Sequence, residues 1–242
     1  MAGVEHEQDE QRRADAREAA YARRDRRRGW TFFVGLGLVL AGLGILGWVG
    51  WQLYGTNWVS QKRQQQTVDR LEQEWDGGGQ GRETVQTEQG PARAILRIPA
   101  FGDDFAVPVM EGVADDALAS GIGHFEGTAG PGEVGNFALA GHRVTHGEPL
   151  RDMPDLQPGD EVVVETRDAT YTYVLDTGGD DLRVPFTDGW VVEPEPVNPD
   201  GGVGPRPGKD RLITLTTCAE LFHTDDRLIA FGHLQRVDRR QG

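Results

Sequence analysis

One long uncharged run near the N-terminus limits this chain more than any other feature of its sequence. From Trp30 to Trp51 it contains no Asp, Glu, Lys or Arg. At ~1.5 Å per residue, a helix of this length crosses the ~30 Å core of a bilayer. Its glycines weaken helix propensity, but a backbone in lipid must satisfy its own hydrogen bonds, so a helix is still expected. We therefore predict a transmembrane helix over residues 29–54.

Charges beside this run predict its orientation. An arginine-rich segment over residues 23–28 precedes it, whereas only Lys62 and Arg63 follow closely. The positive-inside rule then places the N-terminus in the cytoplasm and the remainder outside the cell membrane. A cleaved signal peptide is the alternative, but the run is longer than the apolar core of a typical signal. Residues 1–28 are expected to form a disordered cytoplasmic tail.

The region after the apolar run divides into a polar part and a folded part. Residues 58–75 are polar and helix-favouring, and a glycine-rich stretch follows them, so 55–93 is predicted as an extracytoplasmic stalk and flexible linker. The formal net charge is −14, and the tail holds nearly equal numbers of acids and arginines, so the outer region is strongly acidic. An acidic domain argues against nucleic acid as a partner.

Short apolar runs separated by Gly, Pro and Asp fill residues 94–237. Such a pattern predicts an antiparallel β-sandwich or β-barrel. Residues 114–120 are expected to form a helical turn, and the Gly/Pro-rich stretch 194–209 a long loop. The expected strands cover 94–98, 105–110, 136–140, 161–165, 170–176, 212–217 and 228–234.

The sole cysteine, Cys218, ends the strand predicted over 212–217. A lone thiol outside the cytoplasm makes no intrachain disulfide, so it is either an inert core residue or a nucleophile. Its position at a strand end, beside a polar loop, favours the nucleophile. Arg227 opens the next strand, and a connection this short usually joins antiparallel neighbours. Its guanidinium would then stabilise a thiolate and later an oxyanion.

Several histidines are candidates for the accompanying base. His142 follows the strand predicted over 136–140 and therefore also leaves a strand end into a loop, where it could exchange protons with a thiol. His146 lies in the same loop, and His223 lies in the loop after the cysteine, so both remain alternatives. His124 is expected in a glycine-rich loop, and His233 is expected to be a structural residue inside the last strand.

These residues resemble those of the sortases, membrane-anchored cysteine transpeptidases of Gram-positive bacteria. The run Thr214–Cys218 matches the TLxTC signature of that family, Arg227 matches the arginine that follows it, and His142 matches the histidine on a separate strand. The segments 132–143 and 156–161 resemble the class E branch found in actinobacteria. The resemblance covers roughly residues 94–236 and agrees with an N-terminal anchor.

The resemblance implies an eight-stranded β-barrel with short helices, and a reaction without cofactor or metal. Cys218 would attack the Thr–Gly bond of a C-terminal LAxTG/LPxTG-type sorting signal, with His142 as acid and base and Arg227 holding substrate and oxyanion. Thr216, Thr217 and His146 belong to the implied substrate-binding set. An amine of lipid II or peptidoglycan would resolve the acyl-thioester, so the implied partners are wall precursors and secreted proteins bearing a sorting signal.

One departure and three alternatives accompany this reading. Class E chains usually carry tyrosine where this chain has His146, so the second residue of the sorting signal stays undefined. The same chemistry could serve pilin polymerisation, for which 77–93 is long enough to fold back as a lid. A tethered barrel without activity would be a binding module, and a barrel that hydrolyses its thioester would be a cysteine protease.

Overall fold

The computed structural model describes residues 33–51, 56–76, 84–218 and 225–240, and two compact units divide the chain between residues 52 and 53. The first unit contains the helix Phe33–Gly50, which is long and apolar enough to cross a membrane and lies within the predicted span. Its large side chains are exposed, Leu38 and Trp48 among them. The predicted tail over 1–28 lies outside the described residues.

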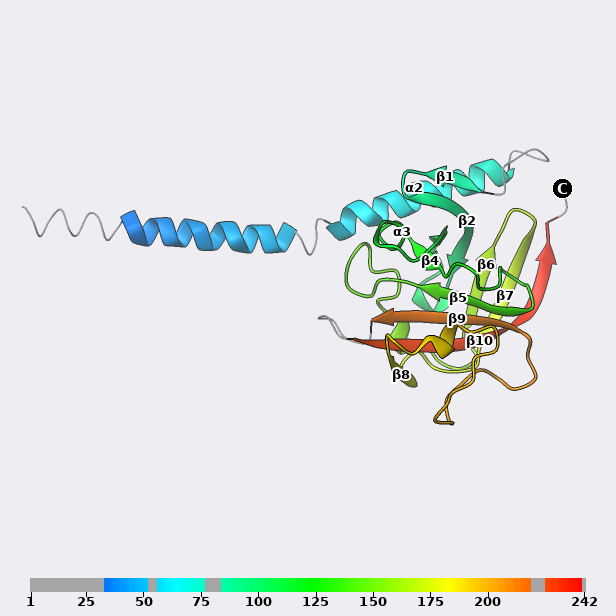
Figure 1. Ribbon diagram of the computed structural model, residues 1–242. Coiled ribbons are helices and arrows are strands. Elements are labelled where there is room, and N and C mark those ends of the chain that lie inside the picture. Colours follow the sequence, from blue (N-terminus) through cyan, green and yellow to red (C-terminus); the bar gives the residue numbers. More distant parts are fainter. Residues whose placement is uncertain (1–32, 52–55, 77–83, 219–224, 241–242) are drawn as a thin grey trace, which may run out of the picture. The chain divides into compact units, whose positions relative to one another are not determined.

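The second unit is built on a closed β-barrel (Figure 1). Eight strands follow one another around it in the order β2, β3, β4, β5, β9, β10, β7 and β6, and β6 pairs with β2 to close the ring. The predicted eight-stranded barrel is thus confirmed. The barrel strands are β2 (Gly90–Arg97), β3 (Val107–Glu111), β4 (Ile122–His124), β5 (Gly135–Ala140), β6 (Glu161–Glu165), β7 (Ala169–Leu175), β9 (Arg211–Cys218) and β10 (Asp226–Arg239).

Two pairings differ from the antiparallel arrangement that the short strands predicted. β3 and β4 are parallel, and so are β5 and β9. Parallel neighbours need a crossover connection rather than a tight hairpin. The helix α3 (Asp115–Leu118) lies in the first crossover, and three further strands lie in the second. The β5–β9 crossover brings together two strand ends that are far apart in the sequence.

Apolar residues fill the barrel, where alternate side chains of each strand point inward. Phe137 and Leu139 of β5 and Ile213 and Leu215 of β9 are buried there. The 3-10 helices η2 (Pro99–Phe101) and η3 (Met153–Asp155) lie in the connections between strands, and Met153 joins the same core. The buried strands β5 and β9 therefore give the residues at their ends a rigid base.

A second apolar cluster joins the helix α2 (Thr56–Asp76) to the outside of the barrel. Val68, Leu71 and Trp75 of α2 are buried against Ile95 and Met110. The helix predicted over 58–75 is therefore present, but it packs on the folded unit where a separate stalk was expected. The adjacent strand β1 (Val85–Thr87) and β2 also begin before the predicted domain start at 94, whereas the glycine-rich residues 77–83 lie outside the described ranges.

A third cluster forms on the outer face of β10. The strand β8 (Leu182–Pro185) pairs with β10, and the 3-10 helix η4 (Gly189–Val192) follows it. Val184 and Val191 pack against Ile229 and Phe231, which are fully buried. This outer segment forms one wall of the cavity described next.

Candidate active site

The cysteine and the arginine predicted to act together lie opposite each other on two neighbouring strands. β9 and β10 are antiparallel, and Cys218 is the direct partner of Arg227 in their register. Residues opposite each other in such a pair have Cβ atoms ~5 Å apart and lie on the same face of the sheet. Cys218 is partly exposed. The guanidinium of Arg227 donates to the carbonyl of Asp226 (3.0 Å).

The parallel pairing of β5 and β9 brings His142 to the same rim of the barrel. Ala140 is the partner of Thr216, so His142 and Cys218 each lie two residues beyond one matched pair. Two hydrogen bonds continue the pairing past the end of β5. The Gly141 N–H donates to the Thr216 carbonyl (3.0 Å), and the Thr217 hydroxyl donates to the Gly141 carbonyl (2.7 Å). The loop that starts at His142 is thus fixed directly to the cysteine strand.

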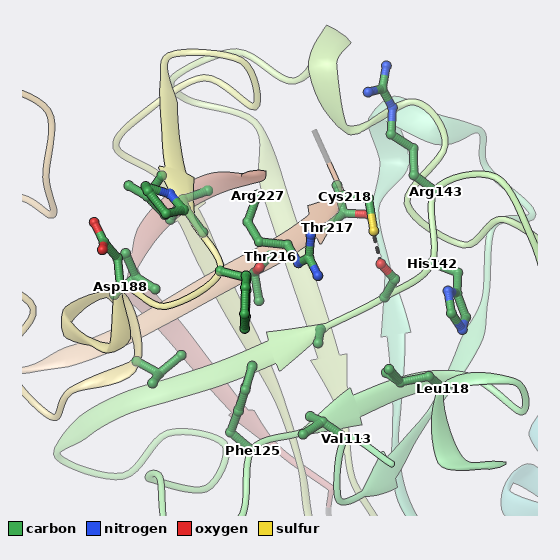
Figure 2. A pocket seen from close by; sticks show the side chains of 18 of the residues that line it. Val113, Leu118, Phe125, His142, Arg143, Asp188, Thr216, Thr217, Cys218 and Arg227 are labelled. Carbon is green, nitrogen blue, oxygen red and sulfur yellow. Dashed lines mark hydrogen bonds between the residues drawn. The ribbon is translucent and has the colours of Figure 1, made fainter. Parts of the chain in front are cut away.

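A cavity of about 630 Å³ opens at this rim. Cys218, His142, Arg227, Thr216 and Thr217 line it (Figure 2). Most of the remaining lining is apolar and includes Val113, Leu118, Phe125, Val184, Val191, Val192 and Ile229, but Asp115, Arg143, Thr145 and Asp188 also border the cavity. A mainly apolar cleft with reactive groups at one end suits an extended peptide whose scissile bond lies beside the thiol.

Burial and a neighbouring imidazole keep His142 neutral. Burial, followed by the charge of His146, lowers the pKa of His142 from its usual 6.5 to about 4, and Asp115 acts in the opposite direction. The two imidazole rings are 4.7 Å apart between centroids. At neutral pH the His142 ring is therefore unprotonated in the resting protein.

Comparison with known proteins identifies this arrangement. The family model for the sortase domain matches residues 96–235, more than half of the chain. The chain belongs to the sortase family. Members of this family are cysteine transpeptidases. Over 204 residues the chain is 35% identical to sortase SrtE1 of Streptomyces coelicolor; the match covers 81% of this chain and 54% of SrtE1, so it spans about half the length of that relative.

Solved structures agree with this assignment. Sortase E from Streptomyces avermitilis is 39% identical, with a TM-score of 0.54 over 63% of this chain and 93% of that one. Sortase E1 from Streptomyces coelicolor, solved with a tripeptide in its active site, is 34% identical, with a TM-score of 0.52 over 64% and 94% of the two chains. The chain is therefore a class E-like sortase.

Of the predicted site residues, Cys218, His142, Arg227, Thr216 and Thr217 line one cavity, but His146 takes a different position. Val144 and Thr145 are among the described residues that line the cavity, whereas His146 is not and lies against His142 instead. Thr217 lines the cavity although its hydroxyl is bonded to the backbone, and Thr216 is also buried.

Of the other histidines, His124 and His233 are described, and neither lines the cavity. His124 was expected in a loop, but it is a buried residue of β4 whose ring contacts Glu111 (3.4 Å) and Thr128 (3.0 Å). His233 is buried in β10, as predicted, and bonds to Asp176 at 2.8 Å. His223 lies outside the described residues. Within the described ranges, no group of three His, Cys, Asp or Glu side chains is arranged to hold a metal ion.

Two parts of the site were not predicted from the sequence. Asp115 opens α3 beside His142, and only the pairing of β3 with β4 brings it there. The wall over residues 182–192 contains the apolar run Trp190–Val192 between two polar stretches. Such an apolar run beside a long polar loop indicates that the run packs against another element of the fold.

Proposed function

We propose that this protein is a sortase that joins secreted proteins to a cell-wall amine through Cys218. The thiolate attacks the carbonyl carbon of the Thr–Gly bond in a C-terminal LAxTG/LPxTG-type signal. His142 gives a proton to the departing glycine amine, and an acyl-thioester remains. The amine of lipid II or peptidoglycan then attacks that thioester, loses a proton to His142 and releases the thiolate.

The observation that carries this proposal is the meeting of three strand ends at one cavity. Cys218 and Arg227 are a cross-strand pair, so a fixed positive charge lies beside the nucleophile and the oxyanion that forms on its substrate. The register of β5 and β9 supplies His142 at the same rim. A nucleophile, a proton carrier and an anion-stabilising group are the components that acyl transfer requires.

The His142 imidazole is expected to be mostly neutral in the resting protein. With its pKa at about 4, the His142 imidazole is rarely protonated near pH 7. The pair of thiolate and imidazolium is then a small fraction of the molecules. Binding of the signal would enlarge that fraction, because excluding water from the site strengthens the attraction between the Arg227 guanidinium and the thiolate.

The cavity supports recognition of a short extended peptide. The related sortase E1 holds a tripeptide in its active site, and its chain is matched over 94% of its length. We propose that Thr216 and Thr217 border the peptide near the scissile bond and that His146 acts on the signal through its contact with His142. Because residue 146 is histidine rather than tyrosine, the second residue of the signal is not defined by the resemblance. Direct comparison of LAxTG and LPxTG peptides decides it.

We propose a cell-membrane location, with residues 1–28 in the cytoplasm. The helix Phe33–Gly50 has the length and composition of a span, and its exposed apolar side chains need an apolar solvent. The arginines before it support the inward orientation of the N-terminus. The catalytic barrel would then face the wall, where both of its substrates are found.

The test uses the full chain in detergent micelles, with fluorogenic LAxTG and LPxTG peptides and triglycine as acceptor. Wild type is expected to release the glycine-led fragment and to form the triglycine product. Cys218→Ala should form neither product, and mass spectrometry should detect the acyl-enzyme only with the thiol present. Equal turnover by wild type and Cys218→Ala would refute the assignment.

The same reaction distinguishes the alternatives. Hydrolysis as the sole outcome at high triglycine would indicate a cysteine protease, and no acyl-enzyme with any signal peptide would indicate a binding module. Pilin polymerisation was linked to a lid over 77–93. The described part of that segment forms no lid, because residues 85–87 and 90–93 belong to β1 and β2. Residues 77–83 lie outside the described ranges.

A further inference from the structure

The helix α2 carries a row of amide side chains that reaches the loop beginning at His142. Its C-terminal half is held by the apolar cluster described above, and Figure 1 shows the helix running along one side of the barrel. Its N-terminal half presents Asn57, Gln61 and Gln64, which recur at helical spacing and therefore share one side. Gln64 is only 5% exposed, which is unusual for glutamine unless its amide is bonded.

Each of these amides bonds to the segment Val144–Glu148. Gln64 Nε2 donates to the His146 carbonyl (3.0 Å), and Gln61 Nε2 donates to the Gly147 carbonyl (3.4 Å). Asn57 uses both ends of its amide: Oδ1 accepts from the Gly147 N–H (3.1 Å), and Nδ2 donates to the Val144 carbonyl (3.4 Å) and the Glu148 carboxylate. We call these three residues the amide row.

The segment held by the amide row has an unfavourable backbone. His146, Gly147 and Glu148 have φ of 54°, 85° and 53°, three consecutive residues in the left-handed region. Residues with a Cβ avoid this region, and such a conformation persists only where surrounding contacts determine it. The amide row supplies those contacts from outside the loop, since the hydrogen bonds fall on the strained residues themselves.

The held segment borders the site proposed above. It keeps the His146 ring 4.7 Å from the His142 ring, and Val144 and Thr145 line the cavity. The loop then returns to its own start, because the Leu150 N–H donates to the His142 carbonyl (3.0 Å). A change of backbone at 146–148 would therefore alter the surroundings of the His142 ring.

We propose that Asn57 and Gln64 of α2 are positioning residues for His142, acting through the strained segment His146–Glu148. The inference rests on the proposed function only where it concerns turnover. The helix thereby contributes to the catalytic geometry from a part of the chain that precedes the barrel. Deletions that start the chain after α2 would keep every signature residue and lose this support.

The effect on His142 can be measured without turnover. The charge of His146 is the second cause of the low pKa of His142, after burial, and Asp115 opposes both. Release of the segment would move His146 away and admit water to His142. The pKa of His142 should then rise from about 4 toward 6.5.

The test compares Asn57→Ala, Gln64→Ala and the double variant in the full chain in detergent. Gln65→Ala is the matched control, because Gln65 is exposed and bonds only within the helix, to Asp69 (3.1 Å), among the contacts described. NMR of labelled histidine in a Cys218→Ala background should show the His142 pKa raised in the row variants and unchanged in the control. In the Cys218 protein, we expect kcat to fall about tenfold, with KM changed less than twofold.

The outcomes separate this inference from the proposed function. If the double variant matches Gln65→Ala in both His142 titration and kcat, the positioning proposal is wrong. If wild type lacks transpeptidation, the proposed function fails, and the titration alone decides the inference. Should Gln64→Ala unfold, as circular dichroism would reveal, the partly exposed Asn57 decides it, and an unchanged titration in Asn57→Ala overturns the proposal.

Discussion

Lowering the pH should destabilise the barrel through His142. A histidine with a depressed pKa favours the neutral form in the folded state, so its contribution is complete above pH 6.5 and is lost as the pH falls through about 4. At ~1.4 kcal/mol for each pKa unit, the difference would be about 3 kcal/mol for a fully buried ring. His142 is partly exposed, so solvent screening reduces our expectation to about 1–2 kcal/mol.

Comparison with His142→Gln isolates this contribution from all other titrating groups. Urea unfolding of both proteins at pH 7.5, 6.5, 5.5 and 4.5 gives the two free energies of unfolding at each pH. Wild type should lose about 1–2 kcal/mol more than the variant between the ends of this range. Parallel curves would refute the assignment of a partly buried, neutral imidazole with a lowered pKa. In the same chain, His146→Gln should raise the pKa of His142 but leave it below 6.5, because burial is the larger cause.

Two further substitutions test packing around the site. Thr217→Val removes the hydroxyl that donates to the Gly141 carbonyl and leaves that carbonyl without this partner. We expect the free energy of unfolding in urea to fall by about 1–3 kcal/mol and the alkylation of Cys218 to be slower. Thr187→Val, at an exposed position, is the control. Leu71→Ala truncates a fully buried side chain on the barrel-facing side of α2 and should cost about 2–5 kcal/mol, while the exposed Arg70→Ala should change stability by less than about 0.5 kcal/mol. Equal stabilities of the two variants would mean that α2 is not part of the folded unit.

The strands were predictable because most alternate or concentrate apolar residues between clear breakers. The run predicted over 161–165 matches β6, and Cys218 and Arg227 were expected as neighbours because a short connection usually joins antiparallel strands. His142 was predicted from its strand end and the family signature. Local pattern was sufficient for these features because each depends on a few adjacent residues.

Features that depend on distant pairing could not be predicted in this way. Nothing local distinguishes a parallel from an antiparallel partner for β5, so the register that matches Ala140 with Thr216 is visible only in the structure. The packing of α2 was missed because its sequence is mostly polar, and only Val68, Leu71 and Trp75 mark its buried side. The left-handed residues at 146–148 depend on contacts with Asn57 and Gln64, which are more than eighty positions away in the sequence.

The strand β10 follows every other barrel strand along the chain, and the barrel depends on it. It pairs with β7, β8 and β9, and it alone supplies Arg227 opposite the thiol. A chain in which β10 has yet to pair therefore has a cysteine without the cation opposite it, in a ring that is not yet closed. The topology delays assembly of the reactive centre until β10 has docked, which limits premature acylation of the thiol while the barrel is incomplete.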